Sequence, residues 1–219
     1  MSESFFDGNP YGVVRKVDEC GVVFVATISA SVPLRFGVIV GEVIYNLRSC
    51  LDQMICQAIV GNGEKLTHHS GFPISRSPKE FEFAFPGKVK GASTEVAALV
   101  KALKPYKGGN DGLWYLNEMS NNEKHKFPVL VAARYTELII RPRSVPTPYR
   151  FPQRRVILLQ AGTELSRVVG GPEVNVNPEF TFRIAFGENQ ILEGEPVIEL
   201  LQQLADWVEG TIQPFEAFL

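Results

Sequence analysis

Residues 13–28 read VVRKVDECGVVFVATI, two runs rich in β-branched residues on either side of the polar segment Asp18-Glu19-Cys20-Gly21. Runs of this composition favour extended strands, and a short polar segment that contains glycine is typical of the turn between two strands. The stretch therefore predicts an antiparallel β-hairpin.

After Pro33 the apolar residues change to a helical spacing. They are Val40, Val43, Ile44, Leu47, Leu51, Met54, Ile55 and Ala58. Because Gly61-Asn62-Gly63 is typical of a helix end, the spacing predicts a long first helix over about residues 37–60. A second amphipathic pattern predicts a C-terminal helix over about residues 196–212, with Pro196 in its first turn.

The rest of the chain alternates between strand signals and irregular stretches. The strand signals cover residues 129–133, 136–140, 155–159, 165–169 and 180–186. Short helices are expected from Ser93 or Thr94 to Leu103 and around residues 113–119. Residues 67–91 contain prolines, glycines and phenylalanines without a sustained period, which indicates an irregular connection. The expected fold class is α+β, a single domain of residues 1–219 in which an antiparallel sheet packs against a few helices.

The composition narrows the classes of protein that the chain can represent. A formal net charge of -2 excludes a uniformly basic nucleic-acid-binding protein. The three cysteines contain no Cys-x-x-Cys pair, so neither a disulfide framework nor a zinc ribbon is expected, and a cytoplasmic location is favoured. The sequence has neither a signal-peptide pattern nor a run of roughly 20 apolar residues, so no membrane role is expected.

The small net charge conceals a basic segment. Residues 1–163 contain 20 Lys and Arg against 14 Asp and Glu, whereas residues 164–219 contain 2 against 10. Residues 141–155 hold five arginines, Tyr149 and Phe151, and no acidic residue. This segment is either a loop that binds a phosphate backbone and stacks bases, or a solvated connection whose arginines pair with the acidic final quarter.

Arg48 and Asp52 are the first candidate site residues. They lie four residues apart on one flank of the apolar stripe of the helix over residues 37–60, where they can form an ion pair. One interpretation is a surface pair that contributes about 0.3 to 0.5 kcal/mol. The other is a functional pair, in which Arg48 stabilises an anionic oxygen and Asp52 fixes the rotamer of Arg48.

The second candidate is the polar segment Asn121-Asn122-Glu123-Lys124-His125-Lys126. His125 lies between two lysines and can serve as a general acid or base, while Lys124 can hold a phosphate or a carboxylate. The alternative is a helix C-terminus, where cationic side chains complement the helix dipole and asparagine provides the cap.

Several motifs together resemble a widespread family of uncharacterised bacterial proteins. They are GEVIYNLRSCLDQ at residues 41–53, FPI at 72–74, KPY at 104–106, LWYL at 113–116 and NEKHK at 122–126. The first helix of that family typically reads NLRSALDH, and a later turn reads DKH. The resemblance covers most of the chain in order, and it implies one folded unit with Arg48, Asp52 and His125 at the site.

The Arg-x4-His pattern of that family is similar to the motif of the HEPN superfamily, helical RNA-cleaving proteins that need no metal. In such sites the histidine moves a proton at the 2′-hydroxyl or the leaving oxygen, and the arginine stabilises the phosphorane charge. This chain has Gln53 at the position of the histidine, and glutamine cannot transfer a proton near neutral pH. The resemblance therefore implies HEPN-like catalysis here only if His125 replaces the missing base.

Metal and nucleotide chemistry have little support in the sequence. His68 and His69 are adjacent, which would point their rings apart in a helix or a strand, and no further ligand follows at a suitable spacing. P-loop, Rossmann and α/β-hydrolase motifs are absent. We therefore expect neither a metal site nor a cofactor.

Three functional hypotheses remain. The first is a binding module for RNA phosphate or a phosphorylated small molecule. The residues assigned to ligand binding are Asn46, Gln53, Asn122, Lys124, Arg143, Arg150 and Arg154. The second is a metal-independent ribonuclease with Arg48, Asp52 and His125 as its catalytic residues. The third is a structural or regulatory protein that forms a homodimer through its C-terminal helix.

Overall fold

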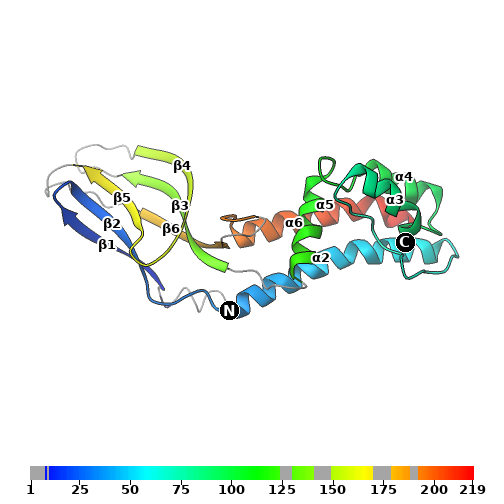
Figure 1. Cartoon of the computed structure of the whole chain (residues 1–219), viewed down its shortest axis with the longest axis horizontal. Coiled ribbons are helices and arrows are strands. Elements are labelled where there is room, and N and C mark those ends of the chain that lie inside the picture. Colours follow the sequence, from blue (N-terminus) through cyan, green and yellow to red (C-terminus); the bar gives the residue numbers. More distant parts are fainter. Residues whose placement is uncertain (1–7, 9, 124–129, 141–148, 170–178, 188–191) are drawn as a thin grey trace. The chain divides into compact units, whose positions relative to one another are not determined.

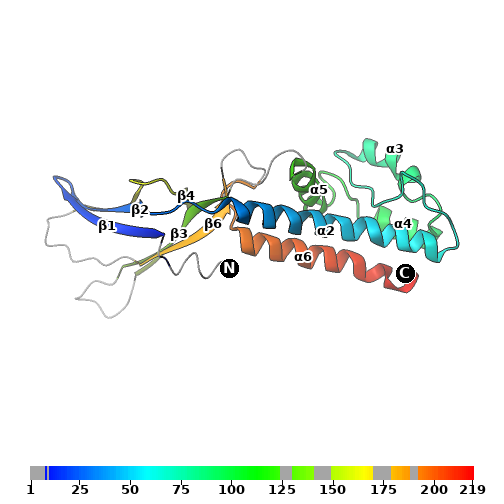
Figure 2. The same ribbon diagram turned by 90° about the horizontal axis from the view of Figure 1, so that it is seen from below.

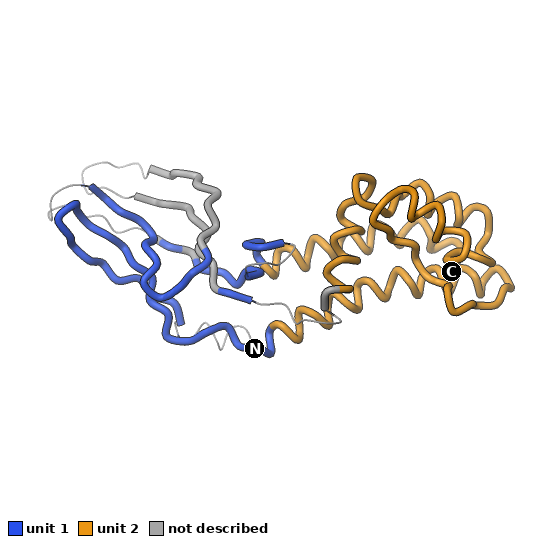
Figure 3. The backbone as a smooth tube through the Cα atoms, viewed as in Figure 1, with its two compact units in different colours: residues 1–36, 129–196 blue, residues 37–128, 197–219 orange. Residues whose placement is uncertain are grey.

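The computed structural model describes most of the chain, with gaps between the described stretches. They are residues 8, 10–123, 130–140, 149–169, 179–187 and 192–219. The chain divides into two compact units, which Figure 3 shows in different colours. Unit 1 comprises residues 1–36 and 129–196, and unit 2 comprises residues 37–128 and 197–219. The α+β fold class is confirmed, and the expectation of a single domain stays a prediction.

The first sheet of unit 1 is antiparallel, with the strand order β1-β2-β5 (Figure 1). β1 (Tyr11–Asp18) and β2 (Gly21–Ile28) form the predicted hairpin. β5 (Glu164–Val169) pairs with the other edge of β2, where Val22 lies opposite Val168. β2 is therefore the central strand, and its first six residues are buried.

The second sheet of unit 1 is also antiparallel, with the order β4-β3-β6. It consists of β3 (Leu130–Ile140), β4 (Tyr149–Leu158) and β6 (Glu179–Phe186). The two strands expected at residues 129–133 and 136–140 form one strand. Their pairing with β4 changes register between Arg134 and Thr136, so the break in the sequence pattern is an irregularity within one strand.

The arginine-rich segment over residues 141–155 is not a loop throughout. The backbone of Arg150 and Arg154 lies in β4, so the loop prediction is wrong for this half of the segment. Pro152 suggested a loop, but β4 is an edge strand, the position in a sheet where a proline is tolerated. Arg143 lies outside the described residues.

Aromatic side chains join the two sheets face to face. Tyr11 and Phe24 of the first sheet contact Phe182 and Phe180 of β6, with ring centroids 6.1 and 5.9 Å apart. The buried core cluster consists of Tyr11, Val22, Phe24, Ala26, Leu159 and Leu165. Because alternate residues of a strand point to the same face, Val22, Phe24 and Ala26 place one face of β2 in this core.

Arg167 on β5 forms two ion pairs at the surface of the first sheet. Its Nη1 lies 2.6 Å from Oδ2 of Asp18, at the end of β1, and its Nη2 lies 2.8 Å from Oε2 of Glu164. The hydrogen bonds that Arg167 donates lower the pKa of both carboxyl groups, and the backbone N–H of Cys20 adds to the effect on Asp18.

We expect the stability of unit 1 to decrease in acid because of these pairs. Since their folded-state pKa values are lowered, both carboxylates stabilise the fold above their unfolded pKa values of about 4, and this contribution is lost as the pH falls through the folded values. The Arg167→Gln variant should therefore lose less stability between about pH 5 and pH 3 than the parent. Urea unfolding followed by the β-sheet circular dichroism signal measures this, and an equal loss in both proteins would contradict the assignment.

Most of the first predicted helix and all of the C-terminal helix lie in unit 2. α2 (Leu34–Gly61) is the first helix, and its residues Ile44, Leu51 and Ile55 are fully buried. α6 (Val197–Ile212) buries its apolar stripe, which includes Leu200, Leu204 and Val208. Figures 1 and 2 show α6 running alongside α2 in the same direction. A short 3-10 helix, η1 (Gln213–Phe218), follows and buries Phe215.

Two shorter helices agree with their predictions. α4 (Thr94–Ala102) follows the N-cap residue Ser93, whose hydroxyl accepts a hydrogen bond from the Val96 N–H. α5 (Asp111–Glu123) lies so close to α6 that a Cβ atom on Gly112 would be 2.5 Å from the Trp207 ring. None of the helices in the described stretches combines the length and the apolar character needed to cross a bilayer.

The expectation of an irregular connection over residues 67–91 is wrong for its second half, where α3 (Pro78–Lys88) forms. Ser77 caps this helix by accepting a hydrogen bond from the Glu80 N–H, and Pro78 occupies the first turn. Phe81 and Phe85, one turn apart, are buried. Pro86 within the helix concealed this short pattern.

Candidate functional site

Arg48 forms the centre of a polar cluster in unit 2. Its Nε donates a hydrogen bond to Oδ1 of Asn117 on α5 at 3.1 Å, and its Nη2 donates to the Phe72 carbonyl at 2.9 Å. Its Nη1 forms an ion pair with Oδ1 of Asp52 at 2.9 Å. The Arg48 side chain is only 13% exposed. The predicted pair of Arg48 and Asp52 therefore exists, and it is part of a larger network.

Asp52 and Arg48 together hold the backbone of Phe72. Oδ1 of Asp52 accepts a hydrogen bond from the Phe72 N–H at 2.8 Å, while Arg48 binds the carbonyl of the same residue. The Phe72 side chain is fully buried. Gly71 is required here, because a Cβ atom would lie 2.7 Å from Oδ1 of Asp52. The pair thus fixes the segment before α3 to α2 and α5.

A pocket of about 390 Å³ opens beside this network. Among the described residues, its charged lining residues are Arg48, Asp52 and Lys88, so two cationic side chains face one anionic side chain. Hydroxyl and amide groups complete much of the wall. They belong to Tyr45, Ser49, Asn117, Ser120 and Asn121. The described part of the lining therefore carries a net charge of one positive unit and suits a small anion.

The side-chain amide of Asn117 has a defined orientation at this pocket. Arg48 Nε can only donate, so the atom of Asn117 that faces it is the oxygen Oδ1. Nδ2 of Asn117 donates no hydrogen bond to any described residue. Because Asn117 lines the pocket, this amide N–H group is available to donate to a hydrogen-bond acceptor.

Lys88 supplies the second positive charge. It is the last residue of α3, and among the described residues it forms no ion pair. Burial raises the pKa of the Cys56 thiol; the charge of Asp52 adds to this shift and the charge of Lys88 opposes it. The pKa of the Cys56 thiol therefore depends on both charged side chains, Asp52 and Lys88.

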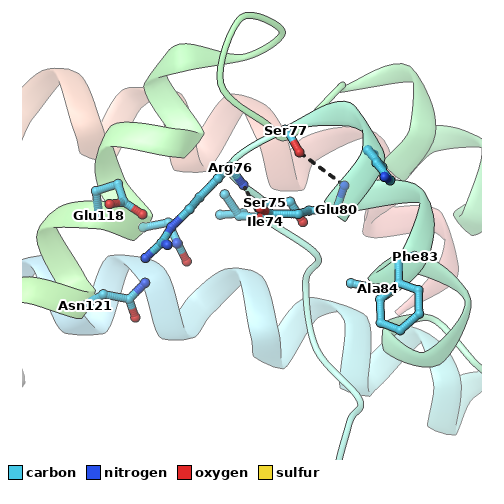
Figure 4. Close-up of a pocket in the computed structure, with 11 residues that line it drawn as sticks. Ile74, Ser75, Arg76, Ser77, Glu80, Phe83, Ala84, Glu118 and Asn121 are labelled. Atoms are coloured by element: carbon cyan, nitrogen blue, oxygen red, sulfur yellow. Dashed lines mark hydrogen bonds between the residues drawn. The ribbon is translucent and has the colours of Figure 1, made fainter.

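A second pocket of about 690 Å³ adjoins the first. The two pockets share the lining residues Ile74, Asn117 and Asn121. Figure 4 shows the Arg76 side chain extending toward Glu118 and Asn121, with Phe83 at the opposite end. Lys79 and Glu80 also line this second pocket.

The structure brings together only some of the residues that the sequence suggested. Asn46 is exposed on α2 and lines neither pocket. Gln53 donates a hydrogen bond to Ser49 Oγ at 3.2 Å and also lies outside both linings. Lys124, His125 and Arg143 fall outside the described residues, as do the side chains of Asn122, Arg150 and Arg154. Their assignments stay predictions.

The two histidines at positions 68 and 69 depart from expectation. Their ring centroids lie 3.8 Å apart, so the prediction that the rings point away from each other is wrong. The reason is that both residues belong to a turn rather than to a helix or a strand. Within the stretches that the structure describes, no group of three His, Cys, Asp or Glu residues could hold a metal ion.

Lys88 and Asn117 are the site residues that sequence reasoning missed. Lys88 lies in the stretch expected to be irregular, and Asn117 lies within the apolar pattern of α5. A polar residue inside such a pattern was the available signal for Asn117, whereas nothing local distinguished Lys88 from other lysines. No family model, curated protein or solved structure matches this chain.

Proposed function

We propose that this protein is a binding module that holds a small anionic ligand, such as a phosphate group, in the pocket beside Arg48. The observation that carries the proposal is that Lys88 and the fixed Asn117 amide both line one pocket, whose described lining residues have a net positive charge. The charged oxygens of a phosphate group accept hydrogen bonds at several positions, so they match a pocket wall that offers hydrogen-bond donors.

Arg48 has a positioning role in this proposal. Its guanidinium is held by Asp52, Phe72 and Asn117, and the Asp52 carboxylate offsets much of its charge. Lys88 and the Asn117 amide therefore make the direct contacts with the anion. This engagement of Arg48 favours binding over the ribonuclease alternative, which assigns Arg48 to the stabilisation of a transition state.

The homodimer alternative would have to use the outer face of α6. The apolar stripe of this helix is buried within the chain, but Ile198 and Trp207, elsewhere on the helix, are exposed. Light scattering of the purified protein decides this alternative independently of any ligand.

We expect inorganic phosphate to bind the full-length chain and the Lys88→Ala variant to bind it at least about tenfold more weakly, because a charge-assisted contact is lost. Isothermal titration calorimetry at about 0.15 M ionic strength measures both affinities. Lys90→Ala is the matched control, since Lys90 is exposed two residues away and lines neither pocket. Equal affinities for the two variants, or no phosphate binding by the parent protein, would refute the proposal.

A further inference from the structure

The two adjoining pockets offer room for a ligand larger than a phosphate ion. Because Ile74, Asn117 and Asn121 line both, a molecule anchored beside Arg48 and Lys88 can extend directly into the second pocket. The volumes of about 390 and 690 Å³ fall in the range of sites for small organic ligands. The chemistry of the second pocket then defines the remainder of the ligand.

The charges of the second pocket are balanced. In the part of the lining that the structure describes, Arg76 and Lys79 balance Glu80 and Glu118, so these residues carry no net charge. Glu80 is already engaged, since its Oε2 accepts a hydrogen bond from the Arg76 N–H. Glu118 forms no ion pair with any described residue, and its carboxylate can accept hydrogen bonds but repels a second phosphate. This pocket suits an uncharged polar group and does not suit the next phosphate of a nucleic-acid backbone.

Phe83 adds an aromatic surface to the second pocket. Phe81 and Phe85 of the same helix are buried, whereas the Phe83 side chain is 91% exposed. Figure 4 places its ring at one end of the pocket and the Arg76 side chain at the other. An exposed aromatic face in a ligand pocket provides a platform on which a planar ring can stack.

The geometry points to a ligand that joins one phosphate to a planar heteroaromatic ring, as a nucleoside monophosphate does. Its phosphate lies beside Lys88 and Asn117, and its ring lies in the second pocket against Phe83, while the polar side chains of Arg76 and Glu118 line the opposite end of that pocket. This inference rests on the proposed function and specifies the ligand class for the same site.

The experiment compares three probes on the full-length chain by titration calorimetry: inorganic phosphate, ribose 5-phosphate and adenosine 5′-monophosphate. We expect the nucleotide to bind at least about tenfold more tightly than ribose 5-phosphate, as one stacked ring predicts. The Phe83→Ala variant should lose this difference and keep its affinity for ribose 5-phosphate. Phe83→Tyr, which retains the aromatic face, should keep the difference. The exposure of Phe83 makes both variants safe for folding.

Each result discriminates between the ligand class and the site itself. Phosphate binding that depends on Lys88, with no preference for the nucleotide or no effect of Phe83→Ala, overturns the ligand class and leaves the anion site intact. Loss of all three probes overturns both. Single-stranded RNA that binds with an affinity rising with its length, and more tightly than the mononucleotide, also overturns the inference, because a continuous phosphate backbone would then be the ligand.

Discussion

Replacing Arg48 with alanine is expected to lower the free energy of unfolding of unit 2 by about 2–4 kcal/mol. The variant leaves the Phe72 carbonyl and Asn117 Oδ1 without their donor and removes the cation that pairs with Asp52. The partial exposure of Asp52 keeps the loss below that of a fully buried pair. Urea unfolding followed by tryptophan fluorescence measures the effect, because both tryptophans, Trp114 and Trp207, lie in unit 2.

Two comparison variants show whether the loss of stability comes from the hydrogen-bond network of Arg48 or from the surface of the helix. Asn46→Ala changes an exposed residue on the same helix and should alter stability by less than about 0.5 kcal/mol. Arg48→Lys keeps the charge but lacks the planar guanidinium that contacts Asn117, Phe72 and Asp52 at the same time, so its stability should fall between the parent and Arg48→Ala. If Arg48→Ala proves as stable as Asn46→Ala, the network contributes nothing to the fold.

Replacing Phe215 with alanine is expected to lower the free energy of unfolding by about 3–5 kcal/mol. Phe215 is fully buried although it lies in the short η1 segment after the last helix. The substitution therefore leaves a cavity in unit 2 that the surrounding helices can fill only in part. The same fluorescence measurement applies to this variant.

Phe83→Ala is the matched control, because it makes the same chemical change at an exposed position of the same unit. It should change stability by less than about 0.5 kcal/mol. Equal stabilities of the two variants would mean that η1 does not pack as the structure indicates. Circular dichroism of the same samples tests the single-domain prediction: a transition that coincides with the fluorescence transition supports one cooperative unit, and a separate one shows that the units unfold independently.

The elements that could be predicted from the sequence are those with a sustained local period. α2 and α6 repeat apolar residues over several turns, and the β1–β2 hairpin has two runs around a polar turn. α3 was missed because its burial pattern rests on two phenylalanines and Pro86 interrupts it. β4 was misread because the edge position that tolerates Pro152 is set by pairing with β3, far from any local signal.

The same distinction applies to the candidate site. The pair of Arg48 and Asp52 is a property of one helix and follows from their spacing of four residues. The binding of Phe72, and the presence of Asn117 and Lys88 at the pocket, depend on three elements meeting in space. A sequence shows which residues are polar within an apolar pattern, but tertiary contacts decide which of them meet.

The segments of the two units alternate along the sequence, and this affects the chain while it is being synthesised. β2 pairs with β5, and the whole stretch from α2 to α5 is made between them. A nascent chain on the ribosome therefore presents the β1–β2 hairpin with one edge of β2 unpaired until residues 164–169 have been made. Unpaired strand edges are templates for association with other chains. A newly made chain is therefore most prone to aggregate through its hairpin before β5 has been made.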